Sequence, residues 1–492
     1  MRKGKIVIDN FSGGWSNDFA KSATISSPQT TRNTYYSGLF NINKPNYLGQ
    51  ISQALTDSAN PVFTNGLSIN ATKSSTNRGA FISSTGVINE FNLTTAFPSP
   101  VTNWNAAFGS ATVDNFKDIW THRDNLGNEV YYYTYQTATE AFVGIHRPNT
   151  ATGSNATFIT LANRNVLHAG CVSVGNRSFF TDGNFLKSYS PDSNTPAQIN
   201  IGIGYTLRSV CDYGTYAAAV GDNGTSARMW LWNGTSTDAN FQYEIRDTNV
   251  TAVVNEGGDL RVFTFGKNGT TKIKTYNGNG FSEEADWEIP TTLCASPLHG
   301  MVDVWLNQIV WKSPDHFIWT YGSPRKNEFQ SGANRVGKLS NTVGNTLGCV
   351  KNLYEGNLYL GAFGVDSNNY IYLINSETYV LGSINFKTNL YTLPHNSTIK
   401  VIHIYFSQFN QPNANQANGL TFKLYSGYNT TDFLLNKTIP ALPQAGSLKY
   451  YPVLVSANNL DTFYLDINQA NTGMQVIIKK IEVEYTFEEG DI

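Results

Sequence analysis

The side chains best suited to hydrolytic chemistry in this sequence are scattered acidic residues. A glycoside hydrolase needs two carboxyl groups that converge on one bond, and a hydrolase with a nucleophile needs a base beside it. The candidate carboxylates are Asp114, Asp118, Glu140, Asp222, Asp238, Glu283 and Glu284. Most of them stand in turn-like contexts, where Asp commonly binds its own backbone. We therefore expect solvated or turn-capping carboxylates and no catalytic residues.

Histidines and cysteines show no spacing typical of a metal centre. The seven histidines are His122, His146, His168, His299, His316, His395 and His403, without an HxH or HExxH pattern. The four cysteines are Cys171, Cys211, Cys294 and Cys349, without a CxxC pair. Closely spaced ligands are the usual signature of a zinc site. We expect solitary histidines, no metal and no cofactor, with buried free thiols favoured over a disulfide or metal framework.

One segment resembles a glycosidase motif only in part. GDNGTSARMW, from Gly221, is similar to the Asp-box of sialidases and other propeller glycosidases, in which Ser-x-Asp-x-Gly-x-x-Trp closes a hairpin. The leading Ser is missing and Trp230 is displaced. Because the Asp-box is itself a structural turn, we interpret this segment as a hairpin.

A pattern of strand, turn and strand recurs through the middle of the chain. These elements would have to position any functional side chains. Each copy has a short apolar strand, a turn such as DG, DNG or NG, and a strand in which aromatic and polar residues alternate, which is the signature of a hairpin. The clearest copies begin at Arg177, Tyr216, Leu260, Asn307 and Asn357. Weaker copies lie around Gly86 and after Gly127.

The spacing of these hairpins predicts a β-propeller. The turns fall near Gly86, Gly127, Gly183, Gly224, Gly269, Asp315 and Asp366. Intervals of roughly 40 to 55 residues are typical of propeller blades and leave room for four strands each. Closing the sheets into a ring also protects strand edges. We expect an all-β protein with an irregular six- or seven-bladed β-propeller over residues 51–384, and a pair of stacked sandwiches is the alternative.

Residues 385–492 show closer spacing and a clear alternation. In IIKKIEVEY the apolar positions are Ile477, Ile478, Ile481, Val483 and Tyr485, and charged residues lie between them. One face is therefore expected to be buried and the other solvated. This pattern predicts a C-terminal antiparallel β-sandwich, jelly-roll-like, of ordinary single-domain size.

The first 50 residues cannot form a core alone, because apolar residues are sparse and Gly and Pro interrupt them. We expect an extended N-terminal arm with one strand, KIVID, that adds to the sandwich or to the last blade. Aromatic anchors would hold the rest of the arm on a host surface. These anchors are Trp15, Phe19, Tyr35, Tyr36 and Phe40.

Charge and hydropathy exclude some partners. With 34 Lys and Arg against 36 Asp and Glu, the formal charge is -2, and charged residues make up only 14% of the chain. The chain therefore offers no broad electrostatic reason to bind nucleic acid or an anionic membrane. No stretch approaches the ~20 apolar residues of a membrane span, and nothing resembles a signal peptide. We expect synthesis and folding in a cytoplasm.

The start of the chain carries a resemblance to a known class of proteins. An I-x-x-F-S-G-G start at Ile8 is followed by a polar run to Asn33 and a Gly-Leu-Phe step before Pro45. Together with irregular blade hairpins and a terminal sandwich, this resembles the propeller proteins of tailed-bacteriophage virions. The resemblance implies a structural tail component, such as a nozzle, hub or tip protein. Its location would be the virion, and its partners other virion proteins and copies of itself.

Aromatic side chains leave an alternative function open. Most of them lie in the hairpin strands, where cross-strand and inter-blade packing explains them. Trp104 and Trp287 are expected in loops, where they could contact a host surface glycan or a protein partner. A glycan-binding adhesin or receptor-binding tail protein is therefore the alternative to a structural role. A propeller glycosidase or polysaccharide lyase ranks below both.

Overall fold

Every element of the described chain is a β-strand. The computed structural model describes residues 2–8, 30–32, 35–36, 42–43, 49–50, 68–73, 78–83, 88–92, 99–104, 113–147, 156–173, 176–265, 270–290, 298–305, 308–312, 317–322, 332–338, 349–352, 359–363, 371–375, 385–388, 390–410, 420–427, 431–439, 448–469 and 475–488. Within these ranges no helix is long and apolar enough to cross a membrane. Contacts divide the chain into one compact unit of residues 1–48, 317–338 and 377–492, and a second of 49–316 and 339–376.

Seven four-stranded sheets make up the described middle of the chain. The first three sheets contain β6 (Ser68–Lys73), β7 (Arg78–Ser83), β8 (Ile88–Asn92), β9 (Ser99–Trp104); β10 (Val113–Arg123), β11 (Glu129–Thr137), β12 (Ala141–His146), β13 (Ala156–Leu161); and β14 (Gly170–Ser173), β15 (Arg177–Asp182), β16 (Phe185–Ser190), β17 (Ser193–Asn200). The fourth and fifth contain β18 (Thr206–Tyr213), β19 (Tyr216–Asp222), β20 (Ala227–Trp232), β21 (Phe241–Glu244); and β22 (Asn249–Glu256), β23 (Asp259–Phe265), β24 (Thr270–Tyr276), β25 (Phe281–Pro290). The last two contain β26 (Val302–Trp305), β27 (Gln308–Lys312), β28 (Phe317–Gly322), β29 (Gly332–Lys338); and β30 (Cys349–Asn352), β31 (Tyr359–Phe363), β32 (Ile371–Asn375), β5 (Gly49–Gln50).

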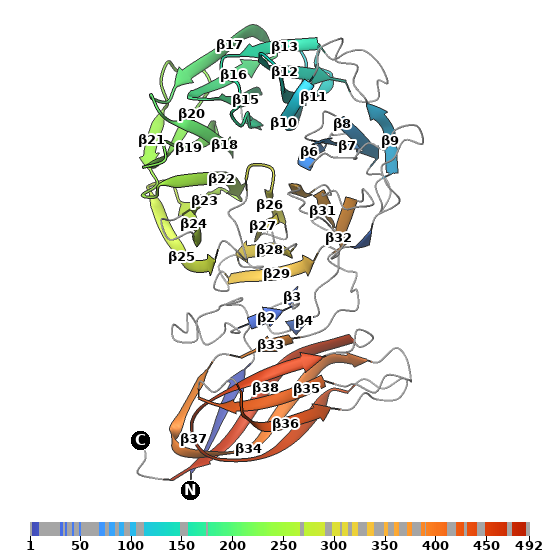
Figure 1. Ribbon diagram of the computed structural model, residues 1–492, viewed down its shortest axis with the longest axis vertical. Helices are drawn as coiled ribbons and strands as arrows, with labels where there is room; N and C mark the ends of the chain where they lie inside the picture. Colours follow the sequence, from blue (N-terminus) through green and yellow to red (C-terminus); the bar gives the residue numbers. More distant parts are fainter. Residues whose placement is uncertain are drawn as a thin grey trace. The chain divides into compact units, whose positions relative to one another are not determined.

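The first strands of these sheets form a closed ring (Figure 1). Each of β6, β10, β14, β18, β22 and β26 contacts the next of them, β26 contacts β30, and β30 contacts β6. The seventh sheet is completed from the start of the chain, because Gly49 and Gln50 pair with Leu373 and Tyr372 of β32. Radial closure of this kind leaves only short strand edges. The propeller expected from the sequence is confirmed, with seven blades among the described residues.

Turn chemistry explains how the hairpins form. The tetrapeptide Asn-Gly-Thr-Ser occurs at residues 223–226 and again at 233–236. At the first site Asn223 Oδ1 accepts hydrogen bonds from the backbone N–H groups of Thr225 and Ser226, at 3.0 and 2.8 Å. Asn233 makes the same bonds at the second site. In both turns the glycine has φ near +80°, which a residue with a Cβ rarely adopts.

Of the expected hairpin turns, those at Gly183 and Gly224 connect the second and third strands of a blade, and the turn at Gly127 does not. The expected turns near Gly86, Gly269, Asp315 and Asp366 lie outside the described residues. The turn at Gly127 joins β10 to β11, the first and second strands of its sheet. The turn between β11 and β12 lies at residues 138–140 and contains neither Gly nor Asn. The prediction at Gly127 therefore identified a real turn but placed it one strand too late in the blade.

Aromatic side chains pack between neighbouring blades. Trp120 of β10 stacks on Phe180 of β15, with ring centroids 6.4 Å apart. Phe179 of β15 meets Trp232 of β20 edge to face at 5.8 Å. Aromatic pairs of this kind contribute about 0.5–1.5 kcal/mol each beyond the area they bury. The packing role expected for the hairpin aromatics is confirmed at these positions.

The C-terminal unit is an antiparallel sandwich whose two layers share one strand. One layer runs β1 (Arg2–Ile8), β38 (Gln475–Phe487), β34 (Tyr391–Asn410) and the first half of β37 (Tyr450–Gln469). The other runs β36 (Phe433–Ile439), β35 (Leu420–Ser426), the second half of β37, β33 (Asn385–Lys387) and β2 (Thr30–Arg32). Both layers contribute alternate residues to one core, such as Ile404 and Phe422.

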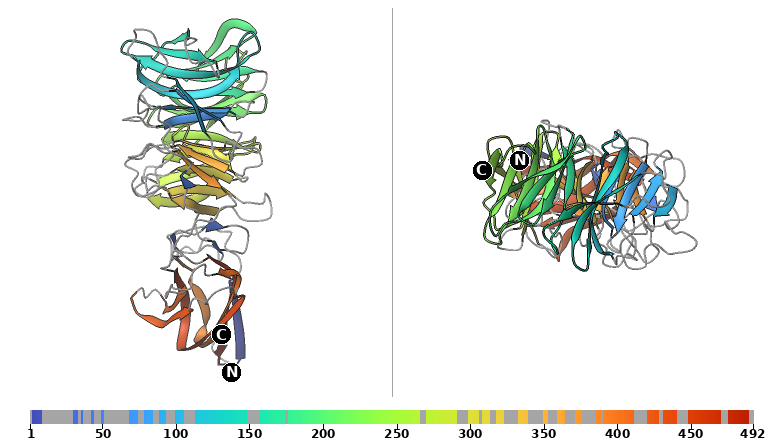
Figure 2. Two further views of the ribbon diagram at one scale, coloured as in Figure 1. Left: turned by 90° about the vertical axis from the view of Figure 1, so that its right-hand side faces the viewer. Right: turned by 90° about the horizontal axis from the view of Figure 1, so that it is seen from above.

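The first 50 residues contain five described strands, not the single strand expected. Strand β1 pairs along its whole length with β38, and Figure 2 shows it in blue beside this sheet. The expected KIVID strand thus adds to the sandwich, where Ile8 is buried in the core. Strands β3 (Tyr35–Tyr36) and β4 (Ile42–Asn43) extend the same sheet from β38, and β5 belongs to the last blade.

Candidate functional site: the propeller channel

The ring of first strands encloses a cavity of about 310 Å³. All seven of these strands contribute lining residues, among them Thr121, Cys171, Asp212, Asn255 and Asp303. Bulges interrupt several of the strands, for example between Phe116 and Asp118 in β10 and between Leu207 and Ser209 in β18. A bulge re-aims the side chain that follows it. At Asp118 and Ser209 these bulges precede the two side chains that bond the His299 ring.

Asp118 is the buried carboxylate of this site, with no exposed surface. Its Oδ1 accepts a hydrogen bond from the N–H of Ile119 at 2.8 Å, and its Oδ2 accepts one from the N–H of Gly170 in the next blade at 2.5 Å. A third donor, His299 Nε2, lies 2.9 Å from Oδ2. The expectation that this residue is solvated or caps a turn is wrong. The protein compensates the buried charge with three hydrogen bonds.

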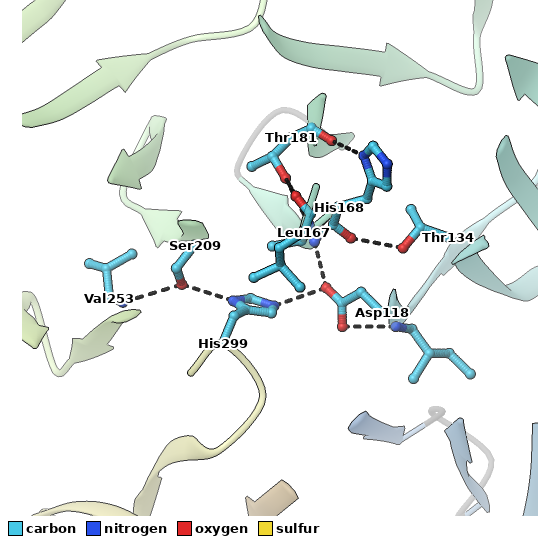
Figure 3. Close-up of polar contacts among 11 residues, drawn as sticks. Asp118, Thr134, Leu167, His168, Thr181, Ser209, Val253 and His299 are labelled. Carbon is cyan, nitrogen blue, oxygen red and sulfur yellow. Dashed lines mark hydrogen bonds and ion pairs between the residues drawn. The ribbon is translucent and has the colours of Figure 1, made fainter. Parts of the chain in front are cut away.

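His299 connects Asp118 of the second blade to Ser209 of the fourth (Figure 3). It lies three residues before the start of β26. Its Nδ1 is 2.8 Å from Ser209 Oγ, which also accepts the N–H of Val253 in β22 at 3.2 Å. Because a carboxylate can only accept, Nε2 carries the proton and Nδ1 accepts the Ser209 hydroxyl. The imidazole therefore bonds side chains of the second and fourth blades, and these two side chains in turn accept backbone N–H groups of the third and fifth blades.

The Asp118, His299 and Ser209 chain has the composition of a catalytic triad but not its accessibility. In serine hydrolases the Ser bonds Nε2 and the Asp bonds Nδ1, the reverse of the arrangement here. Ser209 is fully buried. Among the described residues that line the cavity, His299 is present but Ser209 and Asp118 are not. A substrate in the cavity would not reach the Ser209 hydroxyl, so the geometry suits a structural brace.

A second buried histidine holds the connection that leads into the third blade (Figure 3). His168 Nδ1 donates to the carbonyl of Thr181 at 3.1 Å, and Thr134 Oγ1 of the second blade donates to the His168 carbonyl at 2.8 Å. Thr181 Oγ1 donates to Leu167 O and accepts from Ala169 N. Burial lowers the pKa of His168, which keeps the ring neutral. His168 is thus a core histidine that is hydrogen-bonded to the neighbouring strand.

Buried lysines serve the same purpose at two other connections. Lys274 of β24 donates to the carbonyl of Ile245 at 2.8 Å and lies 3.1 Å from Asp247 Oδ2. Lys187 of β16 pairs with Asp182 at 2.7 Å, and hydrogen bonds from Lys187 and the backbone hold the Asp182 pKa below its usual value. In each pair the lysine lies in the third strand of its blade, and its ammonium group and the aspartate hold one end of that blade in place. Every polar group in these two pairs is engaged by the protein itself.

The cavity lining combines two thiols with a few charged groups. Cys171 and Cys211 are free and partly buried, on neighbouring blades. Burial and the Asp212 carboxylate raise their pKa values well above the usual range, so the thiols stay protonated and poorly nucleophilic. Asp212 accepts a bond from the Asn255 amide at 3.3 Å. No group of three or more His, Cys, Asp or Glu residues suited to a metal ion occurs among the described residues.

The aromatic residues proposed as glycan or partner contacts lie in β-strands. Trp104 ends β9 and Trp287 lies within β25, so the expectation that they occupy loops is wrong. These are the fourth strands of the first and fifth sheets, and the two side chains lie outside the described residues. The backbone of Tyr35 forms part of β3. The backbone of Tyr36 completes this strand, and the side chains of Tyr35 and Tyr36 lie outside the described residues, as do Trp15, Phe19 and Phe40.

Sequence reasoning missed the brace because its members are far apart. Asp118 and His299 are separated by 181 positions, and His299 and Ser209 by 90. Neither residue stands in a motif, and Ser209 has the sequence context of an ordinary strand, YTLRSVC. The usable signal was positional, since Asp118 and Ser209 both fall in the first strand of a blade.

Comparisons with known proteins add little at the level of sequence. No protein-family model matches the chain, and no curated protein matches it. Among solved structures it is similar to the Pan2 WD40 domain of Neurospora crassa, with a TM-score of 0.44 and 8% identity. That match covers 68% of this chain and 99% of the other. The propeller assignment rests on the seven sheets and the closed ring of first strands, not on this likeness.

Proposed function

We propose that this chain is a structural protein of a tailed-bacteriophage virion and that it forms part of the tail through contacts with copies of itself and with other virion proteins. The observation that carries a structural, non-enzymatic role is the buried brace. Asp118, His299 and Ser209 are bonded to one another and to backbone N–H groups, and the hydroxyl is closed off from the cavity. The I-x-x-F-S-G-G start and the order of propeller and sandwich support the placement in a tail.

The physical case for a rigid part comes from how the ring is closed and filled. Strand β5 from the beginning of the chain completes the last blade. Buried polar groups such as His168 and Lys274 bond the connections between strands, and aromatic pairs fill the spaces between blades. Fully satisfied buried polar networks make a structure rigid and unique. Rigidity of this kind suits an assembly component.

Two measurements test the role. Purified full-length protein should self-associate in sedimentation velocity experiments, and mass spectrometry of purified phage particles from its source should detect the chain at a fixed copy number. A chain that stays monomeric at high concentration and is missing from particles would contradict the proposal. A fluorophosphonate probe should leave Ser209 unlabelled, and labelling that disappears in Ser209→Ala would contradict the non-enzymatic role.

A further inference from the structure

The solvent-facing side of the C-terminal sandwich carries a contiguous patch of apolar side chains. Cross-strand pairs of β34 and β37 form it, in consecutive rows. They are Val401 with Leu454, His403 with Pro452, and Tyr405 with Tyr450, together called the Tyr450 patch. Alternate residues of a strand point to opposite faces, and the residues between these, such as Ile402 and Val453, fill the core. The patch thus lies on the face that a solvated sandwich would normally cover with polar residues.

Exposure distinguishes this patch from ordinary surface. Leu454 is 78% exposed and Tyr450 is 41% exposed, and Pro452 between them is exposed as well. Single exposed apolar residues are normal, but neighbouring ones on a single face of a sheet mark interaction surfaces. Aromatic residues are enriched at the centres of protein interfaces. The composition of the patch therefore fits a protein contact.

The aromatic centre of the patch is held in place before any partner arrives. The ring centroids of Tyr405 and Tyr450 are 5.1 Å apart, and the His403 ring stacks on Tyr450 at 5.8 Å. A hydrogen bond of 2.7 Å joins His403 Nδ1 to the Tyr450 hydroxyl. Side chains that are already ordered lose little conformational entropy on binding. Preorganisation of this kind lowers the cost of forming an interface.

The border of the patch carries both positive and negative groups. Lys480 Nζ lies 4.3 Å from the centre of the Tyr405 ring and 2.7 Å from Glu482 Oε1, and the Tyr405 hydroxyl donates to Glu482 at 3.1 Å. Lys5 of β1 and Glu484 are register partners, and their side chains are 49% and 51% exposed. A border with groups of both signs is complementary to a surface that presents the same two charges.

We propose that the Tyr450 patch binds a second copy of this chain, patch against patch about a two-fold axis. This inference rests on the proposed structural function and names the surface that it uses. A two-fold contact requires a self-complementary surface, which an apolar centre with a border of both charges provides. Pro452 lacks an N–H, which disfavours extension of the sheet along the β37 edge. The contact is therefore face to face.

Sedimentation velocity on the full-length protein tests the inference with matched substitutions. Leu454→Asp places a charge at the centre of the patch, and Ile203→Asp makes the same type of change at a residue that is 95% exposed in a propeller connection. Truncating or charging a central interface residue commonly costs tenfold or more in affinity. We expect Leu454→Asp to raise the dimer dissociation constant at least ~tenfold and Ile203→Asp to leave it unchanged. Both positions are exposed, so both variants should fold, as far-UV circular dichroism will show.

Oxidative cross-linking gives a second, independent readout. Leu454→Cys should form a covalent dimer that reductant reverses, while Ile203→Cys and the wild-type chain should not. An oligomer that Leu454→Asp leaves intact would overturn the patch and spare the structural function, whereas a wild-type chain that never self-associates would count against both. Loss of binding to a glycan array in Tyr450→Ser, with sedimentation unchanged, would assign the patch to sugar and overturn the inference.

Discussion

Replacing Asp118 by Asn removes one carboxylate oxygen from a site where three N–H groups converge. In the native chain Ile119 N, Gly170 N and His299 Nε2 donate at 2.8, 2.5 and 2.9 Å. An Asn side chain offers a single acceptor oxygen and turns an N–H group toward at least one of these donors. A hydrogen bond to a charged group contributes about 1.5–3 kcal/mol, and a buried unpaired donor costs about 1–3 kcal/mol. We expect Asp118→Asn to lower the free energy of unfolding by about 3 kcal/mol.

The melting temperature converts this loss into a measurable shift. Unfolding entropy is about 2.1 cal/mol/K per residue, so a propeller of ~300 residues changes by roughly 0.6 kcal/mol for each degree. A loss of about 3 kcal/mol should therefore lower the melting temperature of the propeller transition by ~5 °C. Differential scanning calorimetry on the full chain will separate this transition from that of the sandwich if the two units unfold independently.

Asp192→Asn is the matched control for this substitution. Asp192 forms an ion pair with Arg123 at 2.6 Å, but its side chain is 64% exposed. Exposed pairs contribute about 0–1 kcal/mol, so the control should shift the transition by no more than ~1–2 °C. Equal shifts in the two variants would refute the view that the brace stabilises the ring. So would an Asp118→Asn protein whose transition is unchanged.

Three further changes test other parts of the blades. Burial lowers the pKa of His122 from 6.5 to about 4. The stability that depends on its neutral ring is therefore fully present above pH 6.5 and is lost as the pH falls toward 4. This loss of about 3 kcal/mol in the free energy of unfolding should diminish in His122→Gln, as urea unfolding at several pH values will show. Gly170→Ala places a Cβ 2.3 Å from the Trp120 ring and should cost about 1–3 kcal/mol in the same unfolding assay, whereas Gly280→Ala, with no atom within 4 Å, should be tolerated. Lys274→Met leaves a buried aspartate without its ammonium partner and should cost about 3–5 kcal/mol by calorimetry, and a neutral result would contradict the role given to that pair.

The repeated hairpins could be predicted because each is a local feature. The turns at Gly183 and Gly224 could be predicted from Asn, Asp and Gly, because these residues form hydrogen bonds with nearby backbone N–H groups or adopt positive φ. The same residue types led to a wrong placement of the turn at Gly127. In sequence, a turn between the first and second strands of a blade resembles a turn between the second and third strands. The next turn, at residues 138–140, carries no comparable signal. Trp104, the last residue of β9, was expected in a loop because strand ends are the least certain part of any sequence pattern.

The brace could not be predicted in the same way. Asp118, Ser209 and His299 meet only because a ring brings the first strands of several blades to one axis. Their types were visible, but whether a carboxylate is solvated or buried depends on that closure. Nothing in the sequence indicated that Lys274 is buried, because its ammonium pairs with Asp247 in a connection outside its own strand. Local chemistry therefore predicted the blades, and long-range geometry decided the site.

Completion of the seventh blade by residues 49–50 has a consequence for how the protein is made. Their partners, Tyr372 and Leu373, leave the ribosome roughly three hundred residues later. At ~5–20 residues per second, the early strand waits about 15 to 60 s without its partner. The strand β1 waits longer still, because β38 is synthesised near the end of the sequence. Nascent chains should thus remain open rings until late in translation, when two pairings of very high sequence separation complete first the ring and then the sandwich.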